Sequence, residues 1–278
     1  MEESRMRQAT ADEYLRHHYE IPAELPPMPL PDEPFTALWQ EAEGRGVLDF
    51  LADGLGLPAF EFRWQQERSL GISFARTLGG RLPVIATGSH EDFRSMEALL
   101  CGRTEARELP LTINAFAMQA RAEKIFRHRV LLLNHAPYSN LPAGVLGLSR
   151  EEWLERSYLL RLAHECAHYE TLRLFGEMRN HALDEILADA MGQIVAFGEF
   201  DADRQRLFFG LEKGKGICTG RLLFYVQKVM LEEREKVFHA VDRALDLVAD
   251  ELCEMRMRKA GELEILVALA RRSIAERI

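Results

Sequence analysis

Residues 162–192 read LAHECAHYETLRLFGEMRNHALDEILADAMG. The first two histidines of this stretch decide how the rest of the chain is interpreted. His164 and His168 are four positions apart, so on an α-helix they lie one above the other and both rings can reach one metal ion. Glu165 is rotated by about a third of a turn from His164, which places it beside such an ion. The spacing therefore predicts two nitrogen ligands and a general base on one helix.

The second half of the stretch offers a third ligand. Gly176 is expected to end the first helix, and residues 177–181 then make a turn that lets a second helix run back. Glu185 on that helix is predicted to face the two histidines. Asp189, four positions later, is predicted to accept the second N–H of a ligand histidine. Three protein ligands with one open position are typical of a catalytic zinc site.

Two other side chains compete with Glu185 for the third position. His181 falls in the predicted turn, and Asp184 points about 100° away from Glu185 around the helix. Both stay open as ligands, although the helix face favours Glu185. Cys166 lies between the two histidines in the sequence and is predicted to face the core instead of the metal.

The motif resembles a known signature. HECAH at 164–168 followed by EILAD at 185–189 is similar to the HExxH…ExxAD pattern of the gluzincin clan of zinc metallopeptidases. The resemblance implies a zincin-like fold and a zinc cofactor. It implies His164, His168 and Glu185 as zinc ligands, Glu165 as the catalytic base, and Asp189 as the residue that supports a ligand from behind. The metzincin pattern is not present, because position 171 is Thr and position 174 is Leu.

Local signals around the motif predict an α+β fold. Ser149 and Glu152 form a capping box that starts the helix carrying the motif. Four short apolar or β-branched runs precede it, at residues 70–78, 82–88, 111–118 and 129–136, with a helix near 91–102. A helix is expected over 182–197, and two or more long helices after Gly220. The expected fold is zincin-like: a small, mainly antiparallel sheet, then an active-site helix and a helical C-terminal part.

The N-terminal part has a different composition. Six of the eleven prolines lie between Pro22 and Pro34, and proline removes backbone donors and fixes φ. Residues 1–36 are therefore predicted to be an N-terminal helix followed by a proline-rich strap. One or two short helices are expected within 35–56. Residues 37–278 are predicted to form a single zincin-like domain, with the sheet in 37–148 and the helices and metal site in 149–278.

Charge and composition exclude several classes of protein. The 278 residues carry a net charge of −9, which argues against nucleic-acid binding because phosphate neutralisation needs a basic face. The polar N-terminus lacks the apolar core of a signal peptide, and no window has the length and apolarity of a membrane span. The four cysteines are widely spaced and are predicted to be reduced thiols. We therefore expect a cytoplasmic protein with no membrane partner.

The sequence thus predicts a soluble metallopeptidase in which Glu165 takes a proton from a zinc-activated water. Candidates for the donor to the oxyanion are His181, Tyr225 and His239. An edge strand, either residues 82–88 or residues 111–118, is expected to align a peptide or protein substrate.

Two alternatives remain open at this stage. One is a zincin-fold regulatory or binding protein that retains the metal site with narrow or no proteolytic activity. Its protein partner would bind through the proline-rich strap or the C-terminal helices. The other is a helical interaction module without a metal.

Overall fold

The computed structural model describes residues 8–278, which form two compact units. One unit comprises Pro26–Glu170. The other comprises the described part of Met1–Leu25 together with Thr171–Ile278. The chain combines a small sheet with many helices, so the predicted α+β class is confirmed. The predicted domain boundaries at residues 36 and 148 stay a prediction.

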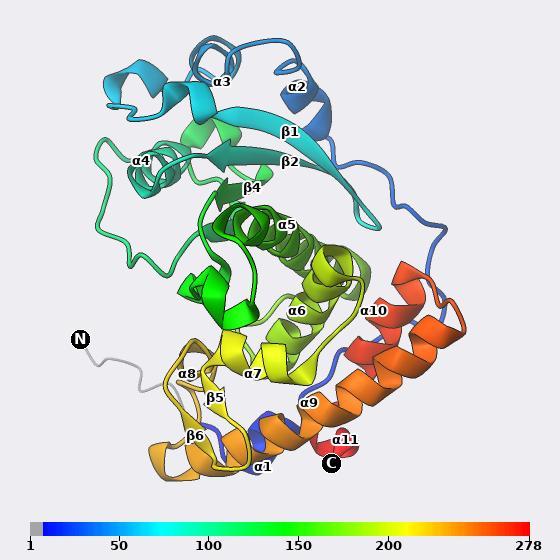
Figure 1. The fold of residues 1–278 in the computed structure, drawn as a ribbon. Helices are drawn as coiled ribbons and strands as arrows, with labels where there is room; N and C mark the ends of the chain where they lie inside the picture. Colours follow the sequence, from blue (N-terminus) through cyan, green and yellow to red (C-terminus); the bar gives the residue numbers. More distant parts are fainter. Residues whose placement is uncertain (1–7) are drawn as a thin grey trace, which may run out of the picture. The chain divides into compact units, whose positions relative to one another are not determined.

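The sheet of the unit Pro26–Glu170 has four strands in the order β1-β2-β4-β3. They are β1 (Gly71–Thr77), β2 (Gly80–Thr87), β3 (Ala115–Gln119) and β4 (Arg129–Asn134). Figure 1 labels three of them, β1, β2 and β4. β2 pairs antiparallel with β1 and parallel with β4, and β3 pairs antiparallel with β4. All four predicted strands are therefore present and the sheet is mainly antiparallel. The expectation that residues 82–88 could be an edge strand is wrong, because β2 is hydrogen-bonded on both sides.

Both faces of this sheet are covered. Residues alternate between the faces of a strand, and in β4 Val130 and Leu132 enter one apolar cluster while Leu131 and Leu133 enter another. The first cluster is built with α2 (Thr36–Gln40), α3 (Val47–Asp49), the π-helical turn Phe50–Gly54 and α4 (His90–Leu100). The second cluster packs against α5 (Arg150–Phe175), which runs beneath the sheet in Figure 1.

The ends of the motif-bearing helices follow their local signals. The Glu152 backbone N–H donates to Ser149 Oγ at 3.1 Å, which caps the start of α5. The helix ends before Gly176, whose φ of 78° is easily adopted only by glycine. α6 spans Ala182–Phe197, as predicted, and is closed by Gly198 at φ 80°. Cys166 packs toward the sheet, as expected.

The second unit is mainly helical. Its long helix α9 (Arg234–Met257) contacts shorter helices that precede and follow it in the chain. These are α1 (Ala11–Leu15), α7 (Ala202–Phe209), α10 (Glu262–Arg271) and α11 (Ile274–Arg277). Between α7 and α8 (Leu222–Tyr225), the short strands β5 (Leu211–Glu212) and β6 (Ile217–Cys218) form a hairpin.

The remaining connections are irregular. Short 3-10 turns lie at Ala59–Glu61, Glu67–Ser69, Glu123–Ile125, Tyr138–Asn140, Ala143–Leu146 and Leu231–Glu233. Residues 22–34 contain neither helix nor strand, as predicted for the proline-rich strap. The predicted N-terminal helix is confirmed as α1, while residues 1–7 lie outside the described part of the chain. Within residues 8–278, no helix has both the length and the apolarity to cross a bilayer.

Candidate metal centre

The two motif histidines lie together on α5. The Nε2 atoms of His164 and His168 are 3.1 Å apart, and their rings are nearly perpendicular, at 87°. Both side chains are buried, with 5% and 7% of their surface exposed. Glu165 is half-buried on the same helix. The predicted side-by-side arrangement of the histidines is therefore confirmed.

His164 has a partner on its other ring nitrogen. The hydroxyl of Tyr138 lies 3.0 Å from Nδ1 of His164, and Tyr138 is itself 4% exposed. Tyr138 follows β4 in the chain and lies 26 residues before the histidine. No local pattern in the sequence signals this contact, because it depends on how the loop after β4 packs on α5.

Glu185 and Asp189 lie on α6, in the other unit. Both are buried, and Asp189 is fully so. The guanidinium of Arg221 and the amide of Gln205 both donate to Oδ2 of Asp189. Arg221 Nη1 also lies 3.9 Å from Oε2 of Glu185. The carboxylates thus share a cation, which stabilises their charged forms away from water.

Tyr225 belongs to the same surroundings. Burial, and next the negative charge of Glu185, raise the pKa of Tyr225 well above its ordinary value of 10.0. The phenol therefore keeps its proton at neutral pH and can serve as a donor. Tyr225 is a residue considered for the oxyanion whose side chain is hydrogen-bonded to the carboxylate of Glu185.

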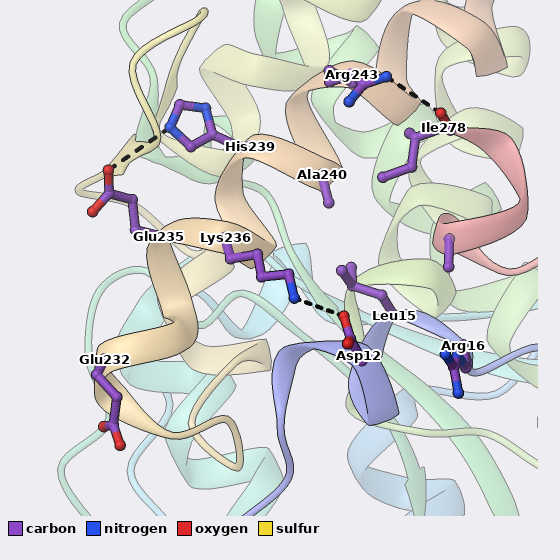
Figure 2. A pocket seen from close by; sticks show the side chains of 11 residues that line it. Asp12, Leu15, Arg16, Glu232, Glu235, Lys236, His239, Ala240, Arg243 and Ile278 are labelled. Carbon is purple, nitrogen blue, oxygen red and sulfur yellow. Dashed lines mark hydrogen bonds and ion pairs between the residues drawn. The ribbon is translucent and has the colours of Figure 1, made fainter.

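His239 has different surroundings. It lines a cavity of about 680 Å³ between residues of α1, α9 and α11 (Figure 2). Its side chain is 46% exposed and Nε2 is 3.8 Å from Oε1 of Glu235. Charged groups of both signs line this cavity, including an ion pair between Lys236 and Asp12 at 2.7 Å.

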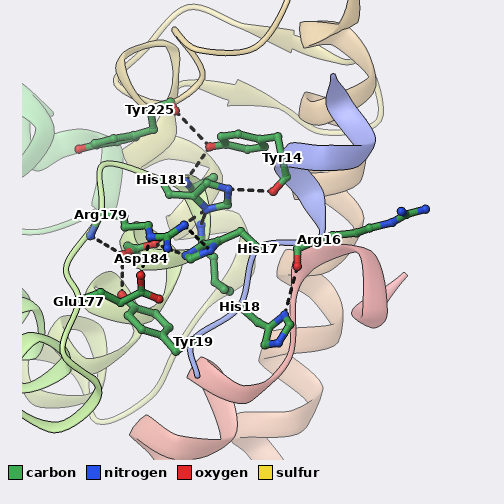
Figure 3. A network of polar contacts seen from close by, with 12 residues as sticks. Tyr14, Arg16, His17, His18, Tyr19, Glu177, Arg179, His181, Asp184 and Tyr225 are labelled. Atoms are coloured by element: carbon green, nitrogen blue, oxygen red, sulfur yellow. Dashed lines mark hydrogen bonds and ion pairs between the residues drawn. The ribbon is translucent and has the colours of Figure 1, made fainter. Parts of the chain in front are cut away.

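The competing ligands His181 and Asp184 take part in another network (Figure 3). His181 is the N-cap of α6: Nδ1 accepts from the backbone N–H of Leu183 at 3.0 Å, and Nε2 lies 3.0 Å from the carbonyl oxygen of Tyr14. These contacts leave the proton on Nε2. Both ring nitrogens are therefore engaged by backbone groups.

Asp184 is fully buried and binds the N-terminal segment. Its Oδ1 accepts from the hydroxyl of Tyr19 at 2.5 Å and from the backbone N–H of Arg179 at 2.9 Å. Its Oδ2 lies 3.5 Å from Nε2 of His17. His17, His181 and Asp184 each have one ligand-type atom within 4.8 Å of those of the other two. The Arg179 guanidinium lies 3.2 Å from Nδ1 of His17 and can only donate to it. A histidine that binds a metal instead donates its second ring N–H to an acceptor. We therefore interpret this cluster as a hydrogen-bonded network.

The fold and the site define an α+β protein with a buried histidine pair on α5. Residues 112–276 match a family described as a family of unknown function (DUF7005), and this region contains both HECAH and EILAD. Because the match covers more than half of the chain, the protein belongs to this family. No curated protein and no solved structure shows a match.

Proposed function

We propose that the protein is a zinc-dependent metallopeptidase with a zincin-like fold. The observation that carries the proposal is the separation of 3.1 Å between the Nε2 atoms of His164 and His168. Two nitrogens bound tetrahedrally to one zinc ion, with bonds of about 2.0–2.1 Å, would lie about 3.3 Å apart. The histidine pair therefore fits zinc with little movement of either ring.

Glu185 is the third ligand in this proposal. The ExxAD motif supports it, as does the engagement of both competitors elsewhere, His181 by backbone groups and Asp184 by the N-terminal segment. Asp189 carries the second carboxylate of the motif and is held by Arg221 and Gln205.

A bound zinc ion would supply Lewis acidity that lowers the pKa of a water molecule and polarises a substrate carbonyl. Glu165 takes the proton from the attacking water and passes it to the leaving amine. Tyr225 is the proposed donor to the oxyanion, since it lies close to Glu185.

The substrate in this proposal is an extended peptide or protein segment. β3 lies at the edge of the sheet, where a peptide can add as a further strand through main-chain hydrogen bonds. Residues 111–118, one of the two runs considered from the sequence, include most of this strand. We place the activity in the cytoplasm, because all four cysteines are free thiols.

The test combines metal content with turnover. Purified wild-type protein is expected to hold about one equivalent of zinc and to cleave members of a mixed peptide library in a chelator-sensitive way. Glu165→Gln should keep the zinc and lose at least about a hundredfold in rate. The matched control is Glu155→Gln, an exposed carboxylate on the same helix, which should behave as wild type. Glu185→Gln should weaken zinc binding.

The outcomes separate the hypotheses. A zinc content below about a tenth of an equivalent after mild purification would refute the proposed metal site. Full activity in Glu165→Gln would refute the role of Glu165 as the general base. Zinc binding by the wild type without cleavage of any peptide would favour the zincin-fold regulatory or binding protein.

A further inference from the structure

One face of α5 presents a stripe of five side chains, the first four of which contact the end of β4 or the loop after it. The stripe comprises Trp153, Ser157, Arg161, His164 and His168. Their spacing of four, four, three and four residues keeps them on one side of the helix. The three residues before the histidines bind the loop, and the two histidines form the candidate metal pair. The loop and the pair are therefore aligned by the same helix face.

The loop is fastened at both ends of its central turn. Trp153 Nε1 donates to the carbonyl oxygen of Leu141 at 2.7 Å, and the backbone N–H of Tyr138 donates to Ser157 Oγ at 3.0 Å. Ser157 is fully buried, and Trp153 is 1% exposed. Buried hydrogen bonds of this kind hold one backbone conformation, because breaking them would leave polar groups without water.

Arg161 binds the loop after β4 more strongly than Trp153 and Ser157 do. Only 3% of its surface is exposed, and its guanidinium donates to the carbonyl oxygens of Asn134, Ala136 and Pro137 at 3.1, 3.0 and 3.3 Å. Its Cζ atom also lies 5.6 Å from the centroid of the Tyr138 ring. Charge-assisted hydrogen bonds are roughly twice as strong as neutral ones, so the cation fixes the loop and the ring together.

The loop held by these contacts places the Tyr138 hydroxyl next to His164. This hydroxyl lies 3.0 Å from Nδ1, while the opposite ring nitrogen, Nε2, faces Nε2 of His168 at 3.1 Å. A neutral imidazole carries its proton on one nitrogen only. If the hydroxyl oxygen accepts a hydrogen bond from Nδ1–H, the lone pair of Nε2 points to the place where a metal would bind.

We propose that Tyr138 is a positioning residue of the metal centre: its hydroxyl oxygen accepts a hydrogen bond from the Nδ1–H of His164 and so selects the tautomer that binds metal through Nε2. This inference rests on the proposed function. The sequence had predicted Asp189 for support of a ligand histidine, and for His164 this role falls to Tyr138. Partners of this kind orient the ligand ring and raise its basicity, and their loss typically weakens metal binding by about 10- to 100-fold.

The experiment measures zinc affinity directly, by competition with a chromogenic chelator. Tyr138→Phe is expected to bind zinc about 10- to 100-fold more weakly than wild type, and the cobalt-substituted variant should show an altered visible spectrum. The control is Tyr158→Phe, a half-buried tyrosine on α5 whose ring stacks on His135 with 4.5 Å between centroids. It should bind zinc as wild type does.

A second measurement avoids the variant altogether. Nitrogen-15 NMR of zinc-loaded wild-type protein should show the proton of His164 on Nδ1 and the metal-shifted resonance on Nε2. Metal on Nδ1, or equal zinc affinity in Tyr138→Phe and wild type, would overturn the role of Tyr138 and leave the proposed function intact. Failure of the wild type to bind zinc would overturn both.

Discussion

The ring of Tyr14 stacks on the ring of His181, with 3.9 Å between their centroids, and Nε2 of His181 donates to the carbonyl oxygen of Tyr14 at 3.0 Å. This contact joins the N-terminal segment to the first turn of α6, four residues before Glu185. Neighbouring groups of the same segment bind Asp184 through Tyr19 and His17. The N-terminal segment therefore stabilises the helix on which the third proposed ligand lies.

His181 is expected to make stability depend on pH. Burial, and next the neighbouring His17, lower the pKa of His181 to about 4, against about 6.5 in the unfolded chain. The unfolded chain therefore takes up this proton first. The free energy of unfolding should fall as the pH drops from about 6.5 toward 4, by about 3 kcal/mol from this group, and stay level above 6.5.

Urea unfolding between pH 4.5 and 7.5 measures this dependence. In His181→Asn the dependence should become shallower, because asparagine can cap the helix without titrating. His239→Asn is the control, since that ring is half exposed. An unchanged pH slope in His181→Asn would contradict the prediction.

The Tyr14 hydroxyl is expected to contribute to stability. It accepts from the backbone N–H of Ala182 at 2.8 Å and donates to the carbonyl oxygen of Tyr225 at 3.2 Å. Tyr14→Phe leaves the buried N–H of Ala182 without this partner, so unfolding should become easier by about 1–3 kcal/mol. Denaturant titration with Tyr158→Phe as the reference checks this. Equal stability of the two variants would mean that water replaces the hydroxyl.

Arg221 is expected to be essential for the buried carboxylates. Asp189 is fully buried, and Arg221 donates to it, so Arg221→Met leaves a charge in the interior without its cation. Removing one member of a buried pair costs about 3–5 kcal/mol. The control is Arg256→Met, which breaks an exposed pair with Glu199 and should cost less than about 1 kcal/mol. Thermal unfolding of both variants gives the comparison, and similar losses would refute the expectation.

Gly210 is expected to tolerate no side chain. Its φ is 67°, and an added Cβ would collide with the backbone of Gly220, where the chain leaves the β5–β6 hairpin. Gly210→Ala should therefore destabilise the protein by more than about 1 kcal/mol. Gly71→Ala, at a position with open space around the added atom, is the control. Chemical denaturation of both variants tests the difference, which would vanish if the hairpin could shift.

The parts of the fold that local chemistry determines were predicted well. Ser149 and Gly176 mark the ends of α5, and the turn before Ala182 marks the start of α6, because caps and positive φ act within a few residues. Strand order was not accessible in the same way. β2 is internal because it pairs with β4, a strand that lies more than forty residues further along the chain.

The same distinction holds for the candidate site. Helical spacing alone places His164 beside His168. Tyr138 and Arg221 reach the proposed ligands through tertiary packing of loops, and neither belongs to a recognisable motif. The sequence offers the candidate groups of the proposed centre, but the residues that orient them depend on contacts between distant segments.

The position of β2 and of the N-terminal segment bears on how the protein can be dissected. A fragment trimmed to residues 112–276 would keep every proposed ligand, yet β4 would lose its parallel neighbour. Asp184 would also lose the phenol of Tyr19, and the first turn of α6 would lose Tyr14. Such a fragment should be aggregation-prone, because an uncovered apolar strand can pair with other molecules. The region that matches the family is therefore shorter than the region that the fold requires. Protein expressed for metal analysis should include the residues before 112.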